Sequence, residues 1–220
     1  SRSSEINHAP RLPRETLLAE ARRLRAAGAD RIDVGCDPGD VWTGIGDAVR
    51  MLVDDGLAVS VDSFEPREIA AATRAGATLV LSVNSTNVAA AADWGCEVVA
   101  VPDVPSTLEG FAATIETLDR AGVPFRLDPV LEPIGFGFAE SLGRYLDCRR
   151  RYPAAEMMMG IGNLTELTDV DSAGINALLI GFCQETGIRS VLTTEVIHWA
   201  ASSVRECDLA RRLAFHAVSN

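Results

Sequence analysis

Short apolar runs alternate with longer amphipathic stretches along this sequence, and most of the apolar runs end at a polar residue. Six runs each follow a glycine that closes a predicted helix: 31–34, 58–61, 78–81, 97–100, 125–127 and 190–192. Glycine adopts the left-handed conformation that ends a helix, so the repeated order is helix, glycine, strand. With two further runs at 5–7 and 156–159, the pattern predicts eight parallel strands covered by helices.

Eight strand–helix repeats in 220 residues fit a compact barrel better than an open doubly wound sheet. We therefore predict an α/β protein with a (β/α)₈ TIM-barrel fold. No G-x-G-x-x-G motif follows the first strands, which weakens a dinucleotide-binding interpretation. We expect one domain over residues 1–220, and the missing initial Met is consistent with a domain excised from a longer polypeptide.

Two capping patterns predict where helices begin. Ser106–Glu109 has the S/T-x-x-E form of a capping box, so a helix is expected to start there. Asp171 precedes an apolar stripe at helical spacing and is expected to cap the helix that carries it.

Seven strands end on, or within a residue or two of, a short amide or acid. These residues are Asn7, Asp33, Asp62, Asn84, Asp128, Asn163 and Glu195. The active site of a TIM barrel lies at the C-terminal rim of its strands, so these side chains should converge there.

Composition narrows the chemistry. The net charge is −11, which argues against nucleic acid or an anionic membrane surface as a partner. All 20 basic residues are Arg, so Schiff-base aldolases and pyridoxal enzymes, which need a lysine amine, are excluded. No apolar run reaches the ~18 residues of a membrane span. Five scattered cysteines predict free thiols in a reducing, cytoplasmic compartment.

Five motifs, in strand order, carry a resemblance to a known family. They are Gly-Ala-Asp-x-Ile-Asp-Val-Gly at 28–35, Val-Asp-Ser at 61–63, Asn-Ser-Thr at 84–86, Asp-Pro at 128–129 with Gly-Phe-Gly at 135–137, and Gly-Ile-Gly-Asn at 160–163. Together the motifs resemble the pterin-binding barrel superfamily of dihydropteroate synthases and methyltetrahydrofolate corrinoid methyltransferases. The sequence is most similar to dihydropteroate-synthase-related proteins associated with tetrahydromethanopterin synthesis.

The resemblance implies a pterin as ligand or substrate. A pterin presents parallel N–H donors that a carboxylate accepts as a bidentate pair, and a carboxamide can bind the remaining edge. The expected pterin-binding residues are Asp62, Asn84, Asp128, Asn163 and Asp33. Ordinary roles remain open: Asp62 or Asn163 as a local cap, Asp33 as a hydrogen-bonded core acid, and Glu195 as part of an ion pair.

The resemblance also implies a diphosphate and magnesium side. Asn7 matches the position beside the diphosphate and its Mg²⁺, with a turn residue as the alternative role. The family's Lys on the seventh strand and Arg-x-His on the eighth are absent here. Arg11, Arg14 and the backbone N–H groups near Gly160 and Gly162 are therefore the expected phosphate contacts.

The leading functional hypothesis is a dihydropteroate synthase-like transferase that joins a dihydropterin methylene group to an arylamine in folate or methanopterin biosynthesis. One alternative is methyl transfer from a reduced pterin to a corrinoid protein, which Asn84-Ser85-Thr86 and Asn163 favour. The other is a non-catalytic pterin-binding domain, which the missing basic residues favour. A small-molecule pterin and a second copy of the chain, as a homodimer, are the expected partners.

Overall fold

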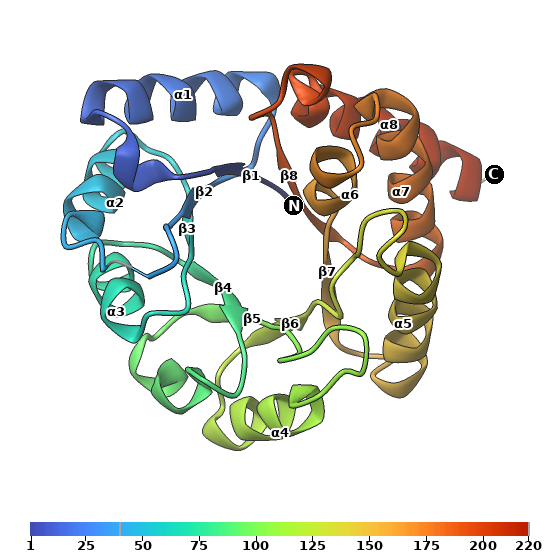
Figure 1. Cartoon of the computed structure of the whole chain (residues 1–220), viewed down its shortest axis with the longest axis horizontal. Coiled ribbons are helices and arrows are strands. Elements are labelled where there is room, and N and C mark those ends of the chain that lie inside the picture. The colour runs from blue at the N-terminus through green and yellow to red at the C-terminus, as the bar shows by residue number, and fades with distance from the viewer. Residues whose placement is uncertain (40, 220) are drawn as a thin grey trace.

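The computed structural model describes residues 1–39 and 41–219. Asn220, the last residue of the predicted domain, lies outside this range. Eight parallel strands form a closed barrel in the order β1 to β8, with β1 paired to β8 (Figure 1). Their bounds are β1 Arg2–Ile6, β2 Arg31–Gly35, β3 Val59–Asp62, β4 Leu79–Val83, β5 Glu97–Ala100, β6 Phe125–Leu127, β7 Glu156–Gly160 and β8 Ser190–Thr194. The predicted (β/α)₈ fold is confirmed.

Helices form a ring around the barrel (Figure 1). They are α1 Arg14–Ala27, α2 Ile45–Asp54, α3 Pro66–Arg74, α4 Phe111–Ala121, α5 Phe138–Arg151, α6 Gly162–Leu167, α7 Ser172–Thr186 and α8 Ser203–Ser219. The described residues also form three short 3₁₀ helices: η1 Ala9–Arg11, η2 Val88–Asp93 and η3 His198–Ala200. The segment after β4 is thus a 3₁₀ helix, and the short α6 is an additional element after β7.

Side-chain alternation along each strand separates two kinds of buried surface. On β2, Ile32 and Val34 belong to the large core between the barrel and the helices. A smaller apolar cluster, formed mainly by Leu79, Leu81, Val99 and Met158, is separate from that core. Because successive strand residues point to opposite faces, Asp33 and Gly35 face the barrel interior. The interior therefore combines apolar and acidic side chains.

The predicted capping box at Ser106–Glu109 is wrong. Residues Val104 and Glu109 form an isolated antiparallel bridge instead, and α4 begins at Phe111 after Gly110. Gly110 has φ = 73°, and a Cβ there would lie 1.9 Å from an Asp103 carboxylate oxygen. The close approach of this loop to Asp103 therefore delays the helix start by several residues.

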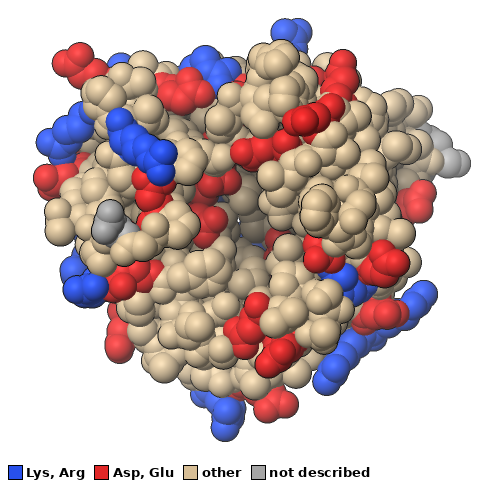
Figure 2. All heavy atoms as spheres, viewed as in Figure 1, with Lys and Arg blue, Asp and Glu red and all other residues tan. Residues whose placement is uncertain are grey.

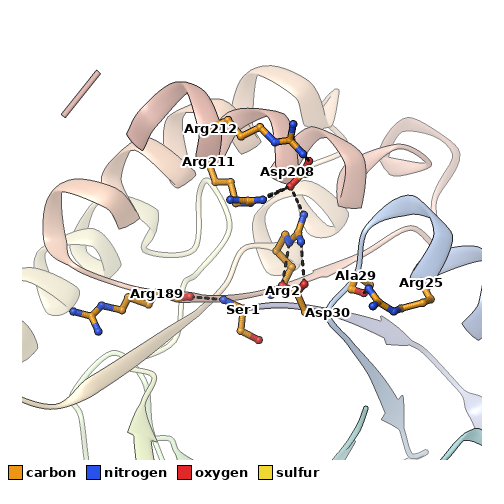
Figure 3. Close-up of polar contacts among 9 residues, drawn as sticks. All are labelled: Ser1, Arg2, Arg25, Ala29, Asp30, Arg189, Asp208, Arg211 and Arg212. Carbon is orange, nitrogen blue, oxygen red and sulfur yellow. Dashed lines mark hydrogen bonds and ion pairs between the residues drawn. The ribbon is translucent and has the colours of Figure 1, made fainter. Parts of the chain in front are cut away.

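Charged residues connect the start of β1 to α8 (Figure 3). Arg2 donates to Asp30 at 2.9 and 3.1 Å and also pairs with Asp208 of α8. Asp208 accepts further ion pairs from Arg211 and Arg212. This network joins β1 to the last helix and gives these charges a structural role at the end opposite the polar strand tips.

The predicted cap at Asp171 is confirmed, since its carboxylate accepts from the Ala173 N–H at 3.2 Å. We expect Asp171→Ala to lower the free energy of unfolding by about 1 kcal/mol, because the first turn of α7 loses its acceptor. Urea denaturation measures the change. Asp147→Ala, in an exposed ion pair with Arg150, is the control and should change stability by less than about 0.5 kcal/mol. Equal effects of the two changes would contradict a capping role.

Among the described residues, no helix combines the length and apolar character needed to cross a membrane. The five cysteines are free thiols, three of them buried.

Candidate functional site

A cavity of about 310 Å³, called here the mouth cavity, lies at the C-terminal ends of the strands. Its lining includes residues that follow or end β3, β4, β6 and β7, namely Asp62, Asn84, Asp128, Gly160 and Asn163, together with Glu5 of β1. Figure 2 shows this face of the barrel hollowed at its centre, with acidic side chains around the opening. The volume is at the lower end of the range typical of small-molecule sites, roughly 300–1,000 Å³.

The wall of the mouth cavity has an apolar part and an acidic part. Leu81, Val99, Met158 and Leu192 supply apolar surface from β4, β5, β7 and β8. Glu5 and Asp62 supply carboxylates from β1 and β3, and Asp128 supplies another after β6. No Arg or His is among the described lining residues. Such a pocket suits a flat, uncharged ring that carries several N–H donors.

Asp128 is held in a fixed orientation. Its Oδ1 accepts from the Tyr145 hydroxyl of α5 at 2.5 Å and from the Val130 N–H at 2.8 Å. The backbone N–H of Gly160 also donates to this carboxylate. Tyr145 is fully buried, so α5 positions the acid from behind. Asp128 does not cap a helix, because α5 begins only at Phe138.

Burial raises the pKa of Asp128 to about 6, against the opposing effect of the hydrogen bonds from Tyr145, Val130 and Gly160. At neutral pH the carboxylate is therefore mostly ionised and can accept two N–H groups of a ligand. The same burial raises the pKa of Tyr145 well above its ordinary value, so the phenol remains a donor.

Removing the Tyr145 hydroxyl should change the titration of Asp128. We expect Tyr145→Phe to raise the Asp128 pKa further above 6, by roughly one unit, because the ionised carboxylate loses a buried donor. Carboxyl ¹³C NMR on aspartate-labelled protein measures this. Tyr152→Phe changes the only other tyrosine and should leave the titration as it is. An unchanged Asp128 pKa in Tyr145→Phe would contradict the assigned role.

The side-chain amides of Asn84 and Asn163 differ in which atom is left to bind a ligand. Asn84 is 8% exposed, and its Oδ1 accepts from the Thr86 N–H at 3.0 Å and the Thr86 hydroxyl at 2.7 Å. Its oxygen is thus engaged in a local turn, and the amide nitrogen is the group that can face a ligand. Asn163 lies in α6 and donates to the Leu131 carbonyl at 3.1 Å, which leaves its oxygen as an acceptor. Both line the mouth cavity, and ligand binding by these two amides stays a prediction.

Asp62 ends β3 and borders the mouth cavity. The cap alternative for Asp62 is wrong, because Glu65 caps α3 through the Arg67 N–H. Asp33 lies deeper and has no exposed surface. Its Oδ1 accepts from the Ser60 hydroxyl at 2.6 Å, as expected of a hydrogen-bonded core acid, and it still faces the barrel interior.

Glu5 joins Asp33 and Asp62 in a cluster, here called the carboxylate triad. One carboxylate oxygen of each lies within 4.8 Å of the others. Burial, then the charges of Asp33 and Asp62, raises the pKa of Glu5 to about 9. Burial and repulsion by Asp62 raise the pKa of Asp33 to about 8, and burial also raises the pKa of Asp62. The triad therefore holds protons near neutral pH.

The expected phosphate contacts lie outside the mouth cavity, except Gly160. Arg11 donates to Asp37 at 2.7 Å, and Arg14 lies 3.5 Å from Asp47. Gly162 is buried, and a Cβ there would lie 3.2 Å from the Thr194 methyl group. The Gly160 N–H is engaged with Asp128. Phosphate binding by these residues stays a prediction.

Asn7 follows β1 directly and lies among acids. Its Nδ2 donates to Glu166 Oε1 at 3.4 Å, and with the amide turned it donates to Glu5 Oε1 at 2.6 Å. Glu195 has the structural role foreseen as its alternative. It pairs with Arg23 at 2.7 Å and accepts from the Val204 N–H at the start of α8.

Two site residues were missed from the sequence. Glu5 is two positions before Asn7, so strand alternation places both on the same face, and an acid between Ser4 and Ile6 in a predicted strand was the available signal. Tyr145 carried no such signal, because a tyrosine on the inner stripe of a helix is usually part of the core.

A second cavity of about 400 Å³ adjoins the first. It is lined by residues of the β2–α2 and β3–α3 loops, including Cys36, Asp37 and Ser63, and by Glu68 of α3. Asp62 and Phe64 border both cavities. The rim therefore has two compartments that share one wall.

No protein-family model matches the sequence. The chain is 32% identical over 237 residues to an uncharacterised protein of Methanocaldococcus jannaschii, an alignment that covers 97% of this chain. It spans 44% of the length of that protein.

Solved structures of dihydropteroate synthases share the architecture. The Yersinia pestis enzyme with a pterine–sulfa conjugate aligns at a TM-score of 0.75 and 19% identity, covering 100% of this chain and 93% of the enzyme. The Xanthomonas albilineans enzyme with 7,8-dihydropteroate gives 0.75 and 19%, covering 99% and 92%. The Thermus thermophilus enzyme with 4-aminobenzoate gives 0.68 and 22%, covering 98% and 93%. The chain is thus a closed (β/α)₈ barrel with the fold of the dihydropteroate synthases.

Proposed function

We propose that the mouth cavity binds a pterin. The observation that carries the proposal is the fixed Asp128 carboxylate, which lines the same cavity as Asn84, Asp62 and several apolar side chains. The 2-amino group and the adjacent ring N–H of a pterin are parallel donors that match one carboxylate. Leu81, Val99 and Met158 supply contact for a flat ring. Solved barrels of the same fold, with bound pterin compounds, support this assignment.

We further propose that the chain is a dihydropteroate synthase-like transferase. The carbon–oxygen bond between the pterin methylene group and diphosphate would break, and an arylamine nitrogen would form the new bond and release a proton. The adjoining cavity, which shares Asp62 and Phe64 with the first, gives room for the arylamine. This chemistry needs no protein nucleophile. Binding two substrates side by side supplies the rate gain.

Diphosphate departure needs positive charge, and the described lining of the mouth cavity has no basic side chain. Asn7 lies between the carboxylates of Glu5 and Glu166. Together these three side chains offer the oxygen ligands that suit Mg²⁺. When bound there, the ion would neutralise the leaving diphosphate. Use in folate or methanopterin-type biosynthesis, and a cytoplasmic location consistent with five free thiols, belong to the same proposal.

One observation favours a second function. The mouth cavity lacks a described basic residue, and Asn163 presents an amide there, which suits a methylated reduced pterin without a diphosphate. That reading predicts methyl transfer to a corrinoid protein.

Calorimetric titration with 7,8-dihydropterin tests the pterin site, and two assays then separate the reactions. Diphosphate release that depends on an arylamine supports the synthase-like transferase. Methyl loss from a methylated tetrahydropterin that depends on a corrinoid protein supports the second function. Binding with neither turnover leaves a pterin-binding domain without catalysis. No binding would remove the pterin proposal itself.

A further inference from the structure

The carboxylate triad of Glu5, Asp33 and Asp62 is built from three neighbouring strands. Glu5 pairs in register with Asp33, and Gly35, two residues further along β2, pairs with Asp62. Side chains two residues apart on a strand lie on the same face, so Gly35 occupies the position between Glu5 and Asp62. Its missing side chain lets the two acids approach each other.

Gly35 makes room for the Glu5 carboxylate in particular. A Cβ at this buried position would lie 2.6 Å from Glu5 Oε1 and 3.2 Å from the Ile6 carbonyl oxygen. The φ angle of Gly35 is not in the left-handed range, so the backbone itself does not demand glycine. Glycine is required here because the methyl group of an alanine would occupy the space that the Glu5 carboxylate fills.

The triad has unmet bonding capacity. Asp33 is fully buried, and while its Oδ1 accepts from Ser60, its Oδ2 has no hydrogen-bond partner. Buried carboxylate oxygens without a donor or a cation are costly. Among the described residues, no Arg or His forms an ion pair with any member of the triad. Glu5 and Asp62 border the mouth cavity, so an ion can reach the cluster and retain water ligands.

We propose that Glu5, Asp33 and Asp62 form a binding site for a divalent cation that prefers oxygen ligands, such as Mg²⁺ or Mn²⁺. The donors are all oxygen and lie within 4.8 Å of one another, so a small movement of the side chains brings all three into contact with one ion, and the Asp33 Oδ2 atom gains a partner. The site lies on the β1–β3 wall and does not use Asn7. It shares Glu5 with the Mg²⁺ position proposed beside Asn7 and Asp62 with the proposed pterin site, but it goes beyond the proposed function because it requires neither a pterin nor a diphosphate.

The test is a Mn²⁺ titration of the chelator-treated full chain, with free Mn²⁺ followed by EPR in the absence of pterin. We expect one saturable site per chain, displaced by Mg²⁺. Glu5→Gln and Asp33→Asn, each nearly isosteric, should weaken Mn²⁺ binding at least tenfold. Asp128→Asn is the matched control, since it removes another carboxylate of the mouth cavity outside the triad, and Mn²⁺ affinity should change less than twofold.

Gly35→Ala provides an independent variant that retains all three acids. The added methyl group displaces the Glu5 carboxylate, so we expect weaker Mn²⁺ binding with no change in charge. Thermal melts with a chelator identify any variant that is unfolded. Absence of a saturable site, or equal affinity in wild type, Glu5→Gln and Asp33→Asn, would overturn the proposal, as would an equal loss in Asp128→Asn. Pterin binding is measured separately, so failure of the pterin proposal leaves this result interpretable.

Discussion

Asp128→Asn should lower the affinity for 7,8-dihydropterin at least tenfold in calorimetric titration at pH 7.5. A hydrogen bond to a charged group contributes about 1.5–3 kcal/mol, and the carboxylate is expected to accept two from the ligand. The amide of Asn turns an N–H group toward one of the ligand donors. The hydroxyl of Tyr145 can still donate to the Asn oxygen, so the fold should be retained.

Asp103→Asn is the matched control for this change. Asp103 also borders the mouth cavity, but its Oδ1 accepts from the Ser85 N–H at 3.1 Å and an amide oxygen can accept the same bond. We expect less than a threefold change in dihydropterin affinity. Equal affinities of wild type and Asp128→Asn would exclude Asp128 from the ligand site.

The pKa of Asp128 also sets the pH dependence of binding. Because the ionised carboxylate binds the ligand and the pKa is about 6, the contribution of Asp128 to affinity should be nearly constant above about pH 7. Below pH 6 it should fall about tenfold per pH unit, since protonation places a donor where an acceptor is needed. Asp128→Asn should lack this dependence.

Glu5→Gln should stabilise the protein in chelator-containing buffer, and more so at pH 8 than at pH 5. The pKa of Glu5 is about 9 in the folded chain and about 4.3 when unfolded. Between these values the unfolded state loses its proton while the folded state keeps it. Folding stability therefore declines as pH rises from about 4 towards 9. Gln cannot ionise, so the variant avoids this loss.

The expected gain at pH 8 relative to pH 5 is at least about 1.4 kcal/mol, the equivalent of one pKa unit. Urea denaturation at the two pH values measures it. Glu140→Gln, an exposed change on α5, should stay within about 0.5 kcal/mol at both. A Glu5→Gln variant that is no more stable than wild type at pH 8 would show that Glu5 is not held protonated.

The barrel could be predicted from the sequence because its signals repeat. The order of helix, glycine and apolar strand recurs through the chain. An error in placing one element therefore does not change the predicted fold. Asp171 was predictable as a cap because its acceptor bonds a residue two positions away. The Ser106 pattern failed because a contact between Gly110 and Asp103, set by the tertiary fold, moves the helix start.

The site was predictable in part for the same reason. Asp62, Asn84 and Asp128 follow from strand ends, since a parallel barrel brings such ends together. The carboxylate triad does not, because it depends on registers between β1, β2 and β3 and on the space above Gly35. Tyr145 reaches Asp128 from a helix 17 residues later, a contact that no local pattern encodes.

Because the described lining of the mouth cavity has acidic but no basic residues, the barrel opening should favour neutral ligands over anions. Several acids surround it on a chain of net charge −11, so its field repels anions before any contact forms. Neutral heterocycles enter without that barrier. An anionic ligand, such as the pterin diphosphate proposed above, is therefore expected to enter together with a cation that neutralises its charge.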